Sequence, residues 1–370
     1  MNPSPWWFPI GREVGPQDLV GREPFLADIV ARAGLGESLA ISSPRRTGKT
    51  SVVREALRRL SGDGWLTAFV DLLRHPSEAR LAEALTDAVL QNETGLHRTL
   101  ERLRGAAATA ASLMQLSTKT DAGLEFALRF RTAAPTLEEA LEAGEGLAQR
   151  LGRRIVVAFD EFQTATAIRA DLYGFMRSIL QRHQQAVYLF LGSQAGLLEQ
   201  QFTRPHTPFF KFAIVRPLPG VPAEAWVGYL HDRYREAGRA VSAEFCRALV
   251  ERTGGHPHCT MVVANKVLMV GSLQPGIPEA ALLELAYAAG LEDLAATYDE
   301  TYRSCASPPA AQEVLMRLAA GAPPYRDQAG TPVRRALAAL TDSALVRRVE
   351  RGKYAFVEPM FADWLRRLQM

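Results

Sequence analysis

One eight-residue segment constrains the fold of this chain more than any other. Residues 43–50 read Ser-Pro-Arg-Arg-Thr-Gly-Lys-Thr, between a short apolar run at 38–41 and an amphipathic helix predicted at 49–60. The segment matches the pattern G-x-x-x-x-G-K-[ST], except that Ser43 stands at the first glycine position. In this pattern, backbone N–H groups of the loop and the helix N-terminus surround phosphate oxygens. The sequence therefore predicts a strand, a phosphate-binding loop and a helix in succession.

The residue types in this loop predict how it would bind a nucleotide. Lys49 would reach the β- and γ-phosphates, and the hydroxyl of Thr50 would bind Mg²⁺. Gly48 would let the backbone approach the phosphates closely because it has no Cβ atom. We expect ATP or ADP to contact a continuous stretch of chain: Ser43, Pro44, Arg45, Arg46, Thr47, Gly48, Lys49, Thr50 and Ser51.

A second apolar run, at 154–159, ends in the acidic pair Asp160 and Glu161. Carboxylates at the carboxyl end of such a strand lie where parallel sheets hold Mg²⁺. We expect Asp160 to bind Mg²⁺ and Glu161 to polarise the attacking water. Together with Lys49, this pair predicts an ATPase.

The next apolar run, at 187–191, also ends in polar residues, Ser193 and Gln194. At the end of a core strand, the Ser193 side chain could hydrogen-bond the γ-phosphate or orient the attacking water. It could equally cap the helix that follows. Both roles stay open, although we choose Ser193 as the candidate sensor.

Strands and helices alternate around these motifs. Residues 65–72 read as a strand, 80–90 and 172–184 read as helices, and a last core strand is expected at 209–217. This alternation predicts an α/β fold, in which helices cover both faces of a parallel P-loop sheet. Between these units, residues 116–132 alternate polar and apolar side chains and predict an inserted hairpin.

The second half of the chain predicts two smaller units. Residues 222–270 read as helical with one break, at Gly254, Gly255 and Pro257, and predict a helical lid. Beyond the lid, helices at 309–318 and 332–340 and strands at 344–350 and 354–357 predict a winged helix-turn-helix. We expect four parts: an N-terminal arm at 1–23, a P-loop ATPase core at 24–220, the lid at 221–290 and the winged helix domain at 291–370.

Composition excludes several classes of protein. The formal net charge is only +3, so the chain as a whole is not strongly basic. Its cysteines lack the spacing of a zinc or disulfide framework; they are Cys246, Cys259 and Cys305. No signal peptide and no apolar stretch long enough to span a bilayer is evident, so we expect a cytoplasmic protein. Motifs of metalloproteases and serine hydrolases, such as H-E-x-x-H and G-x-S-x-G, do not occur.

The C-terminal segment at 331–370 is locally basic, with eight basic and four acidic residues. In a winged helix, the second helix and the wing are the elements that contact DNA. Duplex DNA is therefore one candidate partner, and an intramolecular latch against the nucleotide domain is the other. The residues that would contact DNA are Arg334, Arg335, Arg347, Arg348, Arg351 and Lys353.

Further motifs make the chain resemble the archaeal-type P-loop ATPases of the STAND/AAA+ superfamily. The loop P-R-R-x-G-K-T and the D-E pair are joined by Val20-Gly21-Arg22-Glu23 and by Gly254-Gly255-His256-Pro257. The segment 354–364 is similar to the ending Y-x-F-x-D-P-x-F-x-x-W of that family, with Glu358 in place of the usual Asp. The resemblance runs along nearly the whole chain.

This resemblance implies roles for residues outside the loop. Val20, Gly21 and Arg22 would lie near the adenine, and Pro257 would pack beside it. His256 would contact a phosphate or the C-terminal domain, although a helix-terminal histidine is often purely structural. Arg204 would be an arginine finger that reaches a neighbour's nucleotide, or simply a solvated loop arginine.

Three functions remain open on the sequence alone. The leading one is an ATP-hydrolysing conformational switch coupled to DNA or to a protein partner. The second is a winged-helix DNA-binding regulator in which ATP or ADP sets the conformation with little turnover. The third is a non-catalytic scaffold for an assembly, which includes self-association.

Overall fold

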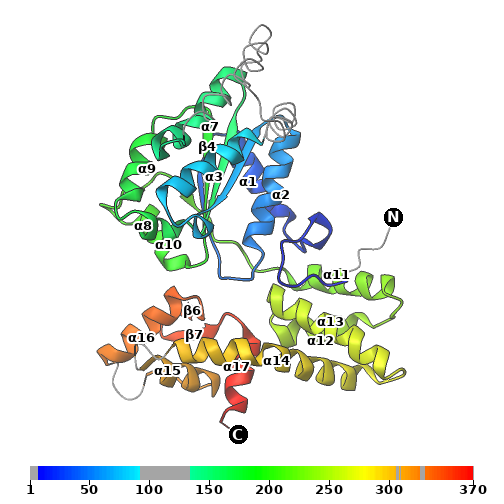
Figure 1. Ribbon diagram of the computed structural model, residues 1–370. Coiled ribbons are helices and arrows are strands. Elements are labelled where there is room, and N and C mark those ends of the chain that lie inside the picture. The colour runs from blue at the N-terminus through cyan, green and yellow to red at the C-terminus, as the bar shows by residue number, and fades with distance from the viewer. Residues whose placement is uncertain (1–6, 92–133, 306–307, 309, 326–329, 370) are drawn as a thin grey trace.

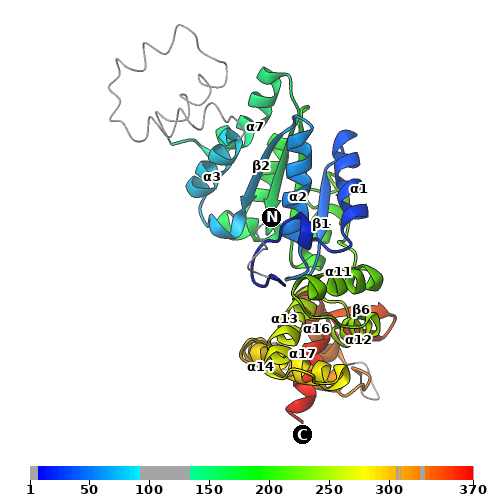
Figure 2. The same ribbon diagram turned by 90° about the vertical axis from the view of Figure 1, so that its right-hand side faces the viewer.

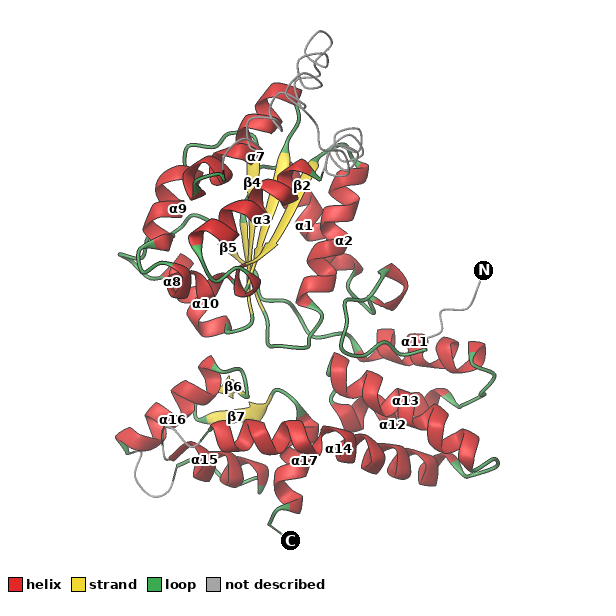
Figure 3. Ribbon diagram, in the orientation of Figure 1, coloured by secondary structure: helices red, strands yellow, loops and turns green. Residues whose placement is uncertain are grey.

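The structure is a computed structural model that describes residues 7–91, 134–305, 308, 310–325 and 330–369. It consists of an α/β part, which contains the sheet, and a mostly helical part joined to it (Figures 1 and 3). Figure 2 shows the same two parts from a second direction. The hairpin predicted at 116–132 lies outside the described residues.

The sheet has five parallel strands in the order β2-β3-β4-β1-β5. β4 lies between β1, which leads into the predicted phosphate loop, and β3, which ends in Asp160. The carboxyl ends of these three strands therefore meet at one edge of the sheet. The predicted parallel α/β fold is confirmed. The strands are β1 (Leu39–Ser42), β2 (Leu66–Asp71), β3 (Ile155–Asp160), β4 (Ala186–Gly192) and β5 (Ile214–Val215).

Helices cover both faces of this sheet, and each face has its own apolar core. Val156 and Ala158 of β3 pack with α1 and α2, whereas Val157 and Phe159 pack with α3, α7 and α9. Alternate residues of β3 are thus buried on opposite faces, as in a central strand of a parallel sheet. The α-helices of this part are α1 (Glu23–Gly34), α2 (Lys49–Gly62), α3 (Glu78–Leu90), α7 (Leu137–Leu151), α8 (Ala165–Ile168), α9 (Leu172–Leu180) and α10 (Ala195–Thr203).

One core strand is much shorter than predicted. The strand expected at 209–217 is confined to β5, so most of that expectation is wrong. Phe209 is instead buried among aromatic rings, with centroid distances of 5.2 Å to both Phe162 and Phe190. The apolar side chains of this segment are therefore explained by burial in the core on one face of the sheet, and not by strand pairing.

The lid contains one more break than the sequence predicted. The helical stretch is interrupted at 237–242 as well as at 254–256, so the expected single break is wrong. Gly238 in the additional break adopts a left-handed conformation with φ of 74°, which glycine adopts readily. The helices are α11 (Ala223–Glu236), α12 (Ala243–Thr253), α13 (Pro257–Leu273) and α14 (Glu279–Ser304).

The C-terminal elements follow the predicted order of two helices and an antiparallel strand pair. They are α15 (Ala310–Ala319), α16 (Thr331–Asp342), β6 (Val346–Glu350), β7 (Lys353–Phe356) and a final helix, α17 (Pro359–Arg367). Their assignment as a winged helix domain stays a prediction. The boundary expected at residue 290 falls inside α14, because this single helix runs on to Ser304, directly before the C-terminal unit of residues 305–369.

The lid and the C-terminal unit share one apolar core. Tyr298 of α14 packs on Phe361 of α17 at 5.2 Å between ring centroids, and the hydroxyl of Tyr287 donates to Asp363 at 2.6 Å. Phe8 of the arm enters the same core. Within the described residues, no helix is both long and apolar enough to cross a membrane.

Candidate functional site

The predicted phosphate loop connects β1 to α2, as expected. Ser43 still pairs with β4, since its N–H donates to the carbonyl of Gly192 at 3.2 Å. Its buried hydroxyl hydrogen-bonds the hydroxyl of Thr47, which also donates to the carbonyl of Pro44 at 2.8 Å. The loop thus accommodates serine at the first glycine position by bonding its side chain internally.

Gly48 begins α2 in a left-handed conformation, with φ of 89° and ψ of 15°. A Cβ atom at this position would meet no described atom within 4 Å. The need for glycine is therefore conformational, because side chains with a Cβ disfavour this region. Arg46 in the same loop is also left-handed, with φ of 63°.

The residues predicted to act on nucleotide and metal come together at the carboxyl edge of the sheet. Lys49 Nζ lies 3.4 Å from Asp160 Oδ1 and 3.6 Å from Glu161 Oε1, and all three side chains are largely buried. The hydroxyl of Thr50 donates to Asp160 Oδ2 at 2.8 Å. Thr50 and Asp160 therefore present oxygen atoms to one point, which suits Mg²⁺.

Glu161 lies in a polar network at the end of β3. Its backbone is left-handed, with φ of 50°, and its carboxylate accepts hydrogen bonds from Ser193 at 2.8 Å and from Gln163. Burial alone would raise the pKa of Glu161, but the charge of Lys49 and these two hydrogen bonds outweigh it and lower the pKa. Glu161 is therefore held ionised beside Lys49.

The structure places Ser193 beside Glu161 rather than in a helix cap. Gln194, not Ser193, is the N-cap of α10, and no side chain caps that helix. The alternative role of Ser193 as a cap is therefore wrong. Its role as a sensor stays a prediction.

A third carboxylate, Asp71, was not among the predicted site residues. It ends β2 and pairs in register with Asp160 at the end of β3. Burial, together with the nearby charges of Asp160 and Glu161, raises the pKa of Asp71. The sequence did offer an indication, because the run at 65–72 carries Asp71 directly before its last residue.

These residues line one large cavity of about 1070 Å³. The phosphate loop, the ends of β2 and β3, the N-terminal arm and the lid all contribute to its wall. The arm is fixed to α2 by the N–H of Val14, which donates to Ser51 Oγ at 3.0 Å. The apolar wall residues from the arm and lid include Ile10, Val14, Val20, Trp226, Pro257 and Met261.

The predicted box at 20–23 connects the loop to the start of the lid. Arg22 donates to the carbonyl of Thr47 at 2.9 Å and to the carbonyl of Pro219. Burial lowers the pKa of Arg22 to about 10. Gly21 is left-handed, and a Cβ atom there would lie 2.9 Å from Pro222 Cδ. This glycine is therefore needed for both conformation and space.

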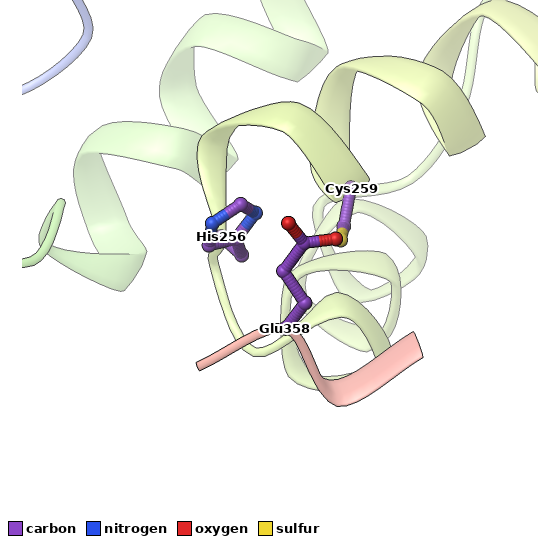
Figure 4. A group of neighbouring side chains, drawn as sticks. All are labelled: His256, Cys259 and Glu358. Carbon is purple, nitrogen blue, oxygen red and sulfur yellow. The ribbon is translucent and has the colours of Figure 1, made fainter. Parts of the chain in front are cut away.

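The histidines of the lid turn are arranged differently from the expectation. Pro257 and His258 line the cavity, whereas His256 does not. His258 Nε2 lies 3.5 Å from Arg46 Nη1, so His258 is the residue that links lid and phosphate loop. His256 points toward Glu358 and Cys259 (Figure 4). His256 therefore faces the C-terminal unit and not the cavity, and its functional role stays a prediction.

Arg204 ends α10, is exposed, and does not line the cavity. Its role as an arginine finger in trans stays a prediction. The candidate DNA-contacting side chains are all exposed as well: Arg334, Arg335, Arg347, Arg348, Arg351 and Lys353.

The residues present fit a nucleoside triphosphate with Mg²⁺. A helix N-terminus and a lysine suit phosphate oxygens, and a threonine hydroxyl next to an aspartate suits the metal. The apolar side chains elsewhere in the wall suit a base. Nothing in this arrangement depends on Arg204 or His256.

Comparisons with known proteins agree with this geometry. No family model and no curated protein matches the chain. A Walker-type ATPase of Pyrococcus abyssi matches with 18% identity and a TM-score of 0.72, covering 97% of this chain and 99% of that one. The ORC2 protein of Aeropyrum pernix, in ADPNP-ADP complexes, matches with 12% identity and a TM-score of 0.56, covering 97% and 95%. The chain therefore has the same fold as these two proteins.

Proposed function

We propose that this chain binds ATP with Mg²⁺, hydrolyses it, and changes conformation with the state of the nucleotide. The observation that carries the proposal is the convergence of Lys49, Thr50, Asp160 and Glu161 at the carboxyl edge of the sheet. The fold shared with archaeal ATPases supports it.

Each of these residues would have a distinct part in hydrolysis. Lys49 and the N–H groups at the start of α2 would bind the phosphates, and Thr50 and Asp160 would hold Mg²⁺. When bound, Mg²⁺ would offset the negative charge of the phosphate oxygens. Glu161, ionised and fixed by Ser193, would orient the attacking water and accept its proton.

The conformational part of the proposal rests on how the lid approaches the phosphate loop. His258 of α13 contacts Arg46 of the loop, and Arg22 bonds both the loop and the segment that leads into the lid. A nucleotide that orders the loop would therefore bias the position of the lid. The lid shares its core with the C-terminal unit, so both would move together.

ATP binding and turnover with Mg²⁺ test this function directly. Lys49→Ala should abolish both, because it removes the charge that binds the phosphates. Glu161→Gln should keep ATP binding but lower turnover by roughly 10²–10⁴, the usual contribution of a general base. Glu284→Gln, which neutralises an exposed carboxylate on α14, is the matched control and should leave both unchanged.

Two results would contradict parts of the proposal. Wild-type turnover in Glu161→Gln would exclude Glu161 as the residue that activates water. Tight ATP binding without turnover by the wild type would favour the second or third function, a nucleotide-set regulator or a scaffold.

Coupling to duplex DNA is a second part of the proposal, supported by the exposed basic residues on α16, β6, β7 and the turn between the strands.

The alternative, in which the C-terminal unit acts as a latch against the core, has support of its own. A Cβ atom at Gly196 of α10 would lie 2.7 Å from Asp342 Oδ1 of α16, so the core and the C-terminal unit approach closely there. The two possibilities predict different responses to duplex DNA and to substitutions on α10 and β6.

A further inference from the structure

Three side chains with metal-binding atoms meet where the lid joins the C-terminal unit. His256 and Cys259 come from the start of α13, and Glu358 immediately precedes α17 (Figure 4). One ligand atom from each of the three lies within 4.8 Å of the others. The cluster lies outside the nucleotide cavity, since none of the three residues lines it.

His256 is the feature of this cluster that ordinary packing does not explain. Its side chain is buried, with the residue 6% exposed, and neither ring nitrogen has a hydrogen-bond partner among the described residues. Buried polar atoms are nearly always paired, because leaving one unpaired costs about 1–3 kcal/mol. A bound ion would give this ring a partner.

The other two members are already close to each other and are held by a neighbour. The thiol of Cys259 lies 3.9 Å from Glu358 Oε2, and the hydroxyl of Tyr298 donates to that same oxygen at 3.0 Å. Tyr298 would thus act as an outer partner that orients the carboxylate. In metal sites, losing such a partner usually weakens metal binding by about 10–100-fold.

The donor atoms select the metal. One imidazole nitrogen, one thiolate and one carboxylate oxygen form a set typical of Zn²⁺, whereas Mg²⁺ and Ca²⁺ prefer oxygen atoms alone. Tetrahedral zinc places its ligand atoms about 3.3–3.7 Å apart, as follows from bond lengths of about 2.0–2.3 Å. Small side-chain rotations would close the present separations to that range.

We propose that His256, Cys259 and Glu358 form a Zn²⁺ site that cross-links the lid to the C-terminal unit, with the fourth position left to water. On binding, the thiol of Cys259 loses its proton to solvent and the thiolate bonds the ion. His256 directly precedes Pro257 and His258, which line the nucleotide cavity. The ion would therefore fix the turn that carries these two residues.

Metal content and a cobalt spectrum of the untagged full-length chain test this site. The protein is stripped with a chelator, reloaded with Zn²⁺ and gel-filtered, and the zinc that remains is measured by mass spectrometry. We expect one zinc per chain. Co²⁺ loaded in its place should give the near-ultraviolet absorption of a thiolate-to-cobalt bond.

Matched cysteine variants identify the ligand. Cys259→Ser should weaken Zn²⁺ affinity more than about 100-fold, beyond the usual effect of losing an outer partner, and should remove the cobalt–thiolate absorption. Cys246→Ser changes an equally buried cysteine of the same lid and should leave both unchanged. Glu358→Gln should weaken Zn²⁺ affinity while the cobalt–thiolate absorption remains at higher Co²⁺.

The proposal is overturned if wild-type protein shows no cobalt–thiolate absorption, or if that absorption survives in Cys259→Ser. The wild-type spectrum decides the question even if Cys259→Ser does not fold, which circular dichroism would reveal. ATP binding is measured in parallel. If Cys259→Ser loses zinc but still binds ATP, the zinc site is distinct from the proposed nucleotide site.

Discussion

Glu161 combines three properties that a residue activating water needs: a fixed position, an ionised carboxylate and a place beside Lys49. Its pKa in the folded chain lies below the ordinary value of 4.5 because Lys49 and the hydrogen bonds outweigh burial. The ionised form therefore stabilises the fold. This stabilisation is fully present above the pKa of the unfolded chain and is lost as the pH falls through the lower folded value.

This sign gives a prediction for stability at low pH. The free energy of unfolding of the wild type minus that of Glu161→Gln should stay constant between about pH 6 and pH 8 and should decrease below about pH 4.5. Urea denaturation across this range measures the difference. Glu284→Gln is the control, because it measures the effect of removing an exposed charge on the free energy of unfolding. A difference that grows as the pH falls would mean that the pKa of Glu161 is raised rather than lowered.

Single residues of the site were predictable where a sequence motif specifies both the residue type and its position. Lys49, Thr50 and Asp160 follow a motif whose spacing fixes their geometry, and the structure brings them together as expected. Asp71 was missed because one acidic residue after a strand is a weak signal without its neighbour in the sheet. His258 was missed because a helix start does not reveal which of two nearby side chains faces the cavity.

Among the elements, the turn between α12 and α13 is closely packed against the residue that begins α17. Gly254 is left-handed, with φ of 61°, and a Cβ atom there would lie 2.6 Å from Pro359 Cγ. Gly238, between α11 and α12, is also left-handed, but a Cβ atom there would meet nothing within 4 Å. The two glycines separate the conformational cost of a side chain from its steric cost.

Alanine at these two positions should therefore have unequal effects. Gly238→Ala should lower the free energy of unfolding by about 1–2 kcal/mol, the cost of a left-handed residue with a Cβ. Gly254→Ala should cost about 1–3 kcal/mol more, because Pro359 must also move. Urea denaturation followed by circular dichroism measures both. Equal decreases in the two variants would mean that Pro359 can shift freely.

Most elements of the core were predictable from apolar spacing, and the exceptions have physical reasons. α7 was not predicted, although its capping box of Thr136 and Glu139 is readable in the sequence. Most of the strand expected at 209–217 was wrong, because aromatic residues are typical of buried strands and of buried turns alike. Periodicity alone does not separate the two.

For the molecule as a whole, the contacts between the C-terminal unit and the core decide how a change at the nucleotide site would affect the rest of the protein. If the exposed basic residues bind duplex DNA, Arg347→Ala combined with Arg348→Ala should weaken binding. It should also reduce the slope of log affinity against log salt by about 0.9 for each phosphate that the variant no longer neutralises. A double variant of exposed lid arginines, Arg235→Ala with Arg247→Ala, is the control.

The latch predicts the opposite outcome in the same assays. DNA should then not bind, and Gly196→Val, which crowds the Asp342 side chain at the contact of α10 with α16, should raise ATP turnover. The sequence led to both possibilities, but it does not show that the lid and the C-terminal unit share one core. That sharing depends on long-range packing such as that between Tyr298 and Phe361.

The docking of the arm has a consequence for how this protein is made. Phe8 is buried in the lid, 5.1 Å from the ring of Tyr234, and its carbonyl accepts a hydrogen bond from Asn265, which lies 257 positions later in the chain. At synthesis rates of about 5–20 residues per second, the ribosome needs roughly 13–50 s to supply that partner. Phe8 thus leaves the ribosome long before its partner and reaches its final place late, and until then its ring is exposed to chaperones and proteases.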